Sequence, residues 1–346
     1  MPGPRLPRTL CLALLIATFA TRAMPASTSA QDAGNDRENP VPLGETVNVG
    51  DWTVQVVDVT LDATKTILAA NATNHPPAEG NQFAMIRVDI TYNGGDTVSV
   101  DNGIGFAALG SANVGYSQYY DPCGTYPDPT SAVTKLHKGD SATLNVCWEV
   151  STSDARSLEL YVQAYYTFLP RVWFSLGNTV TQTMPTGLKG DHSAPATVSG
   201  STQDEPIPLG ERARVNTLIV SVVTTEPRAT ATIREAFPSH ESPQSGHQYF
   251  MATISVTNAS TDMVIPISEV EYTAVGASGV IYTEFTNSCG LIPGADDKYR
   301  DVFPGGTITY SLCWQIDRHD ASTLELTAAP AFSNDTTEQA WLALHR

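Results

Sequence analysis

A pattern of alternating apolar and polar residues around a Cys-Trp pair occurs twice in this chain, 166 residues apart. The first copy reads SATLNVCWEV at 141–150, and the second reads TITYSLCWQI at 307–316. Such alternation predicts a β-strand with one buried face. Trp148 and Trp314 are therefore expected to point into a core, with the preceding cysteine of each copy on the opposite face.

The same offset holds across most of the chain, which makes the sequence a tandem duplication. PLGE at 42–45 matches PLGE at 208–211, and both cysteines of each copy align as well. Further aligned positions include Tyr116 with Tyr282. Each copy is therefore expected to be one structural unit with its own core.

Each unit is expected to be an immunoglobulin-like β-sandwich. Alternating segments at 83–92, 104–109 and 158–166 predict strands in the first copy, and turn residues separate about seven such segments. The fold class is therefore all-β, with two tandem domains at 41–183 and 206–346.

Two segments outside these domains have the composition of irregular chain. Residues 184–205 are rich in Gly, Ser, Thr and Pro, which predicts a flexible linker. Residues 31–40, QDAGNDRENP, are polar and predict a disordered N-terminal segment.

Residues 1–30 have the pattern of a signal peptide. Arg5 and Arg8 precede an apolar run at 10–20 that is too short to cross a bilayer, and small residues follow, with cleavage expected after Ala26 or Ala30. We therefore expect a secreted, extracellular protein, or a periplasmic one if the source has an outer membrane. No later run is apolar enough to predict a membrane span.

The charge balance excludes two classes of partner. Removal of the leader takes away three of nineteen basic residues and none of thirty-six acidic ones, which leaves a net charge of −20. Nucleic acids and anionic membrane surfaces both require basic patches. We therefore expect neither as a partner.

The order of several short motifs resembles a known family. PLGE is followed by G-x-Q-F at 80–83, Tyr116, K-G-x-x-x-T at 138–143 and L-E-L at 158–160. This order is similar to bacterial secreted immunoglobulin-like domains of unknown function, related to the immunoprotective extracellular antigen family of mycobacteria. The resemblance covers both copies, implies an exported sandwich, and supplies no catalytic residues.

The four cysteines outside the leader are expected to form two disulfides. Cys123 lies 24 residues before Cys147, and Cys289 lies 24 residues before Cys313. Equal spacing in an exported chain favours these two pairs. A redox-active or metal-binding role would require C-x-x-C spacing or nearby histidines, which the sequence lacks.

No metal, cofactor or catalytic motif is recognisable. His240 and His247 lie in one polar loop, and Asp296, Asp297 and Asp301 crowd the second cysteine loop, but neither group has a metal-binding spacing. We expect no metal, no cofactor and no enzyme activity. A carboxylate pair brought together by the fold stays open as the basis of an alternative, a secreted hydrolase.

The candidate binding surface is a group of tyrosines around Cys123, namely Tyr116, Tyr119, Tyr120 and Tyr126. Tyrosines in a disulfide-pinned loop are good contact residues, although some of them could instead cap the core. We expect a secreted, non-catalytic binding or structural module that is monomeric and recognises an unknown protein or glycan.

Overall fold

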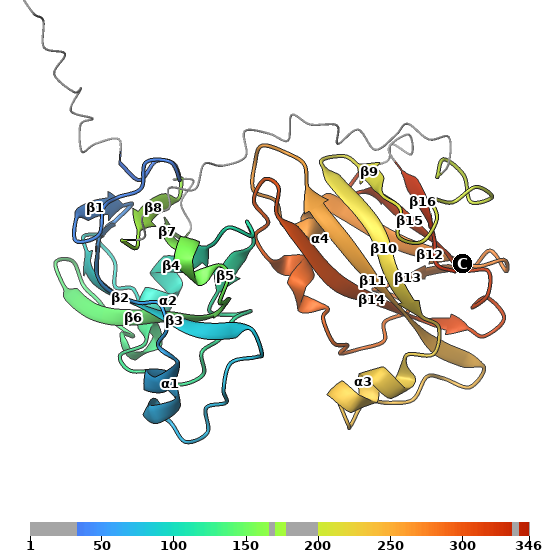
Figure 1. Ribbon diagram of the computed structural model, residues 1–346, viewed down its shortest axis with the longest axis horizontal. Helices are drawn as coiled ribbons and strands as arrows, with labels where there is room; N and C mark the ends of the chain where they lie inside the picture. The colour runs from blue at the N-terminus through green and yellow to red at the C-terminus, as the bar shows by residue number, and fades with distance from the viewer. Residues whose placement is uncertain (1–32, 166–169, 178–199, 334–338, 346) are drawn as a thin grey trace, which may run out of the picture. The chain divides into compact units, whose positions relative to one another are not determined.

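The structure is a computed structural model that describes residues 33–165, 170–177, 200–333 and 339–345. These residues form sixteen strands in four sheets of four strands each (Figure 1). Residues 33–177 form repeat 1 and residues 200–345 form repeat 2. Each repeat pairs two sheets around one core, so the expectation of an all-β fold with immunoglobulin-like sandwiches is confirmed.

In repeat 1 the first sheet has the strand order β1-β2-β3-β6 and the second has the order β5-β4-β7-β8, and all neighbours are antiparallel. The elements are β1 (Thr46–Val49), β2 (Trp52–Thr60), α1 (Thr64–Ala70), β3 (Asn81–Tyr92), α2 (Val100–Gly103), β4 (Ile104–Leu109), β5 (Gly115–Ser117), η1 (Thr130–Ala132), β6 (Ser141–Ser151), η2 (Ala155–Ser157), β7 (Glu159–Ala164) and β8 (Val172–Ser175).

Repeat 2 has the same topology, with sheets β14-β11-β10-β9 and β13-β12-β15-β16. The elements are β9 (Ala213–Val215), β10 (Leu218–Glu226), α3 (Thr230–Ala236), β11 (His247–Asn258), α4 (Pro266–Glu269), β12 (Val270–Val275), β13 (Ile281–Thr283), η3 (Asp296–Tyr299), β14 (Thr307–Asp317), β15 (Glu325–Pro330) and β16 (Ala340–Ala343).

The Cys-Trp strands are β6 and β14, and their faces lie as the alternation predicts. Trp148 and Trp314 are fully buried in the two sandwich cores, with exposed fractions of 0%. The alternate residues of each strand, which include the cysteine, face away from that core. Cys147 and Cys313 each belong to a second, smaller cluster on the outer face of the sheet.

Both disulfides join the cysteine pairs that the spacing predicts, Cys123–Cys147 and Cys289–Cys313. In repeat 1 the disulfide packs against Ile67 of α1 and Phe83 of β3, which form a satellite core with it. The sequence does not predict α1, because a helix of seven residues spans two turns, too few for a periodic pattern. Loop, helix and sheet are thereby held together on one outer face.

The N-terminal segment differs from the expected disordered stretch. Residues 33–39 form turns against β8, and the Trp173 amide donates to the Gly34 carbonyl at 2.9 Å. Arg37 is 2% exposed, and its Nε donates to Glu159 Oε2 at 2.5 Å. This buried ion pair helps to order the segment, although its polar composition predicts disorder.

Three further expectations concern segment boundaries. The strand expected at 158–166 is shorter, because β7 runs from Glu159 to Ala164, and a further strand, β8, follows it in repeat 1. Of the expected linker, 184–199 lies outside the described residues, whereas 200–205 form turns that pack against β16. The expected signal peptide at 1–30 also lies outside the described residues. In the described parts of the chain, no helix has the length and apolar character of a membrane span.

Candidate functional site

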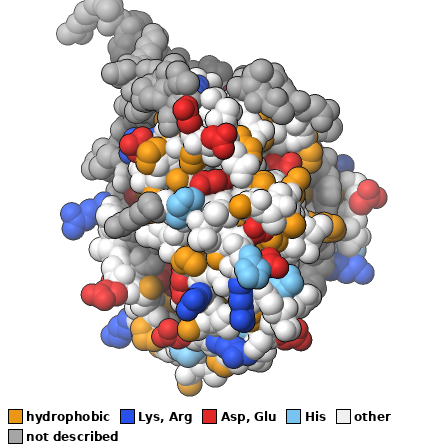
Figure 2. All heavy atoms as spheres, turned by 90° about the vertical axis from the view of Figure 1, so that its right-hand side faces the viewer, with side chains coloured by type: hydrophobic (Ala, Val, Ile, Leu, Met, Phe, Trp, Pro, Cys, Tyr) orange, Lys and Arg blue, Asp and Glu red, His pale blue; other side chains and the backbone are white. Residues whose placement is uncertain are grey.

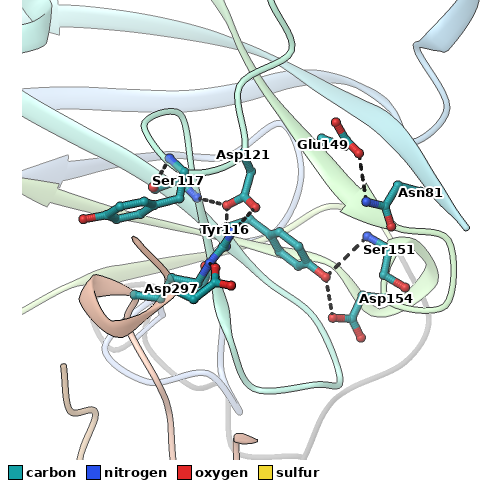
Figure 3. Close-up of polar contacts among 11 residues, drawn as sticks. Asn81, Tyr116, Ser117, Asp121, Glu149, Ser151, Asp154 and Asp297 are labelled. Atoms are coloured by element: carbon teal, nitrogen blue, oxygen red, sulfur yellow. Dashed lines mark hydrogen bonds and ion pairs between the residues drawn. The ribbon is translucent and has the colours of Figure 1, made fainter. Parts of the chain in front are cut away.

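The tyrosine loop follows β5, and its first member, Tyr116, has a structural role. The Tyr116 hydroxyl donates to Asp154 Oδ2 at 2.9 Å and accepts from the Ser151 amide at 3.4 Å (Figure 3). Burial, reinforced by the Asp154 charge, raises the pKa of Tyr116 well above its usual value. The ring joins the edge of the sheet to the turn after β6, and it is therefore a poor candidate for contact with a partner.

Repeat 2 contains the same arrangement, which supports a structural role. The Tyr282 hydroxyl donates to Asp320 Oδ2 at 2.7 Å and accepts from the Asp317 amide at 3.3 Å. Burial opposes ionisation of Asp320, but hydrogen bonds from Ser278 and Tyr282 outweigh it and hold the pKa of this carboxyl below its usual value.

Tyr126 is also largely committed to the fold. Its ring packs against the satellite core around the Cys123–Cys147 disulfide, and Gln118 Nε2 donates to its hydroxyl at 2.6 Å. Burial raises the pKa of Tyr126 to about 12. One edge of the ring still lines a shallow groove of about 390 Å³ beside the disulfide.

Tyr119 and Tyr120 remain as the candidates for contact. Tyr119 is 80% exposed, and its ring lies edge-on to Tyr120 with 4.7 Å between ring centroids. Tyr120 is half-buried because the guanidinium of Arg300 lies 5.7 Å from its ring centroid. The structure therefore divides the four tyrosines into two supports and one exposed pair.

The turn that presents Tyr119 is held by a network around Asp121 (Figure 3). The Asp121 carboxylate accepts from the Ser117 amide at 3.0 Å and pairs with Arg300 at 2.7 Å. The Asp121 amide donates to the Ser117 carbonyl, and the Glu149 amide donates to the Asp121 carbonyl. Burial raises the pKa of Asp121, although Arg300 opposes that effect. A turn fixed in this way presents its ring with little ordering entropy left to lose on binding.

Phe285 of repeat 2 occupies the position equivalent to Tyr119, and the sequence analysis missed it. It is 95% exposed. Its turn is closed like that of repeat 1, because the Asn287 amide donates to the Thr283 carbonyl and the Gln315 amide donates to the Asn287 carbonyl. The 166-residue offset would have found it, since 119 and 285 align. Each repeat thus displays one aromatic ring from the same rigid turn.

The histidines and acidic residues considered as metal ligands are used elsewhere. His240 lies edge-on to Tyr249, and Asp297 pairs with Arg300 at 2.6 Å. Asp301 accepts from the Tyr161 hydroxyl at 2.9 Å. Within the described ranges, no group of three or more His, Cys, Asp or Glu side chains has the geometry of a metal site.

A second groove, of about 630 Å³, lies beside the disulfide of repeat 2 and is lined by Phe237, His240, Tyr249 and Leu291 among others. At the position equivalent to His240, repeat 1 has Asn74, which donates to the carbonyls of Ile67 and Thr125 at 2.7 Å. The two repeats therefore differ beside the disulfide while they share the exposed aromatic turn.

Comparison with solved structures finds thirteen similar chains, and two of them illustrate how distant the similarity is. One is an uncharacterized β-sandwich protein from Clostridium difficile 630, with 11% identity, a TM-score of 0.26, and coverage of 39% of this chain and 93% of that one. The other is a conserved hypothetical protein from Bacillus anthracis, with 8% identity, a TM-score of 0.26, and coverage of 38% and 94%. No family model and no curated protein matches the chain.

Proposed function

We propose that this chain is an exported, non-catalytic binding module that contacts an extracellular protein or glycan through Tyr119 and Phe285. The observation that carries the proposal is that both repeats keep an exposed aromatic ring on the same rigid turn. A large exposed ring costs solubility, whereas aromatic residues dominate the energetics of recognition surfaces.

The net charge of the chain supports recognition of a neutral or basic partner. The chain has a net charge of −17, which disfavours polyanions. On the face drawn in Figure 2, acidic, basic and hydrophobic side chains are interspersed, and no single sign dominates. Aromatic rings bind the faces of sugar rings and apolar side chains equally well, so the rings define the contact and leave the partner class open.

Export and family membership belong to the same proposal. Two disulfides fit an oxidising compartment, and the apolar run after Arg5 and Arg8 fits a leader. The motif order resembles the secreted domains related to the mycobacterial immunoprotective antigen. The proposal therefore places the protein outside the cell.

A binding screen tests the proposal. Immobilised parent protein is compared with the double variant Tyr119→Ala/Phe285→Ala against a panel of envelope polysaccharides and exported proteins. Phe332→Ala is the matched control, because Phe332 is 96% exposed but lies outside both turns. The double variant should lose the ligand that the parent and the control retain. A ligand that all three proteins retain equally would refute the role of the two rings.

The alternative, a secreted hydrolase, is tested with the same proteins. Turnover of glycoside or ester substrates by the parent, abolished by replacement of one carboxylate, would favour it. The proposal of a binding module predicts no turnover above that of the buffer.

A further inference from the structure

A loop of repeat 2 covers one sheet edge of repeat 1. Val302 forms an antiparallel bridge with Val114. The Gly115 amide donates to the Asp301 carbonyl at 2.8 Å, and the Phe303 amide donates to the Asn113 carbonyl at 2.9 Å. Residues 301–303 thus pair with residues 113–115 as a short added strand.

Side chains complete this contact. Phe303 packs against Tyr161 and Trp173, with 5.5 Å between ring centroids in both pairs. The Asp301 carboxylate accepts from the Tyr161 hydroxyl and lies 3.5 Å from a guanidinium nitrogen of Arg171. In the Asp301–Arg171 pair the covered face supplies the positive charge and the loop the negative charge, whereas Arg300, next to Asp301, pairs with Asp121 of repeat 1 in the opposite sense.

No segment in the described ranges pairs with the equivalent edge of repeat 2. Residues 279–281 correspond to 113–115, and there Val280 is 46% exposed and Ile281 is 62% exposed. The backbone turn is the same in both repeats, since Asn113 and Gly279 both have a positive φ, of 58° and 76°. Two apolar side chains are therefore displayed at a strand edge whose counterpart in repeat 1 is covered.

Two positive charges of repeat 1 are replaced by neutral side chains on this face of repeat 2. Gln203 stands where repeat 1 has Arg37, because Gly200 and Gly34 make matching hydrogen bonds to Trp341 and Trp173. Gln339 stands where repeat 1 has Arg171, two residues before the tryptophan of the last strand. The glutamate is kept, as Glu159 in repeat 1 and Glu325 in repeat 2.

Among the described residues, Glu325 consequently has no arginine partner such as its counterpart has. It is 6% exposed, and no hydrogen-bond partner among the described residues reaches its Oε2. Its Oε1 lies 3.4 Å from Nε2 of His345, which is itself 45% exposed. A buried carboxylate with one unsatisfied oxygen is costly, and a cation from outside the chain would relieve that cost.

The loop of repeat 1 that corresponds to 301–304 carries basic side chains that can supply such a cation. The Val98–Leu136 bridge of repeat 1 matches the Val264–Val302 bridge of repeat 2, so the two loops have equivalent backbones. At the positions of Asp301, Phe303 and Pro304, repeat 1 has Lys135, His137 and Lys138, all exposed. The loop is basic where its counterpart is acidic and apolar.

We propose that a second copy of this chain docks residues 135–138 of its repeat 1 on the open edge at 279–281, with Lys138 directed to Glu325. In the covered contact, Pro304 accepts from Asn113, which in turn accepts from Arg37, the partner of Glu159. Lys138 occupies the Pro304 position and therefore enters beside the glutamate. The association is head-to-tail, so it leaves one free edge and one free loop at the ends of every oligomer. It replaces the monomer expected from the sequence.

Sedimentation velocity on the full chain tests this proposal. The parent should form oligomers whose size increases with protein concentration. Added salt should weaken their association, because the contact includes a charge pair. Glu325→Gln and Lys138→Glu should each raise the dissociation constant at least about tenfold. Lys65→Glu is the matched control, because Lys65 is exposed on α1, and it should associate like the parent.

Mixing the two variants makes the test specific. The Lys138→Glu variant has an intact edge at 279–281, and the Glu325→Gln variant has an intact loop at 135–138. In an equimolar mixture this loop should dock on this edge and form a 1:1 heterodimer that does not grow further. A parent that stays monomeric up to about 100 µM, far above typical specific affinities, would overturn the proposal. A closed dimer of the parent, with no heterodimer formed by the two variants, would overturn it as well. So would binding of an unrelated basic protein, and of no second copy, to the face around Glu325.

Discussion

Glu159 and Glu325 occupy equivalent positions at the start of β7 and β15, 166 residues apart, and they differ in their partners. Arg37 Nε donates to Glu159 Oε2 at 2.5 Å, whereas Glu325 contacts His345 at 3.4 Å through one oxygen. A duplicated position has thus kept its buried acid and lost its cation. Two measurable differences between the repeats follow from this relationship.

The first difference concerns the stability of repeat 1. Arg37→Ala leaves Glu159 buried without its cation, and we expect the free energy of unfolding to fall by about 3–5 kcal/mol. Gln203→Ala at the equivalent position should cost less than about 1 kcal/mol. Urea unfolding of both variants measures this. Equal losses would show that the segment around Arg37 contributes by packing alone.

The second difference concerns pH. Burial raises the pKa of Glu325 from 4.5 to about 7, while His345 and the Leu344 amide oppose the shift. The folded state therefore retains a proton that the unfolded chain has released, so stability falls as pH rises through this interval and levels off above it.

Glu325→Gln should remove this loss of folding stability at high pH. The variant should match the parent near pH 4 and exceed it at pH 8 by up to about 3 kcal/mol. Urea unfolding at both pH values, at protein concentrations low enough to prevent association, provides the measurement. A variant less stable than the parent at pH 8 would contradict the assignment of Glu325 as an uncompensated acid.

The paired tryptophans should dominate the two cores. Trp148→Ala and Trp314→Ala should each cost about 3–5 kcal/mol, because each removes a fully buried indole. Val223→Ala, at a side chain 45% exposed, is a control that should cost little. A variant that retains only Trp148 and Trp314 should fluoresce at short wavelength and resist quenching by solutes. Fluorescence typical of exposed indole would contradict the burial of these two side chains.

The sequence predicts the parts of this fold that depend on repetition and alternation. The faces of β6 and β14 and the two cysteine pairs follow from local spacing, because a strand has a period of two and the disulfide loops are of equal length. The helix α1 does not follow, because it is too short to show a period and is held by the disulfide cluster.

The candidate site was predicted only in part. Tyrosine composition alone does not distinguish Tyr119 from Tyr116, since the difference depends on Asp154, which is 38 residues away in sequence. Arg37 was missed because polar composition predicts disorder, whereas one buried ion pair orders the segment. Phe285 could have been found from the repeat offset, but a search for tyrosines overlooks phenylalanine.

Hydroxyl-radical footprinting of the free and the partner-bound protein tests the central claim most directly, because it reports the solvent exposure of individual rings. The account predicts that Tyr119 and Phe285, at 80% and 95% exposure, are oxidised readily in the free protein and protected in the complex, while Phe332 is oxidised equally in both. Unchanged oxidation of Tyr119 and Phe285 in a complex that demonstrably forms would contradict it.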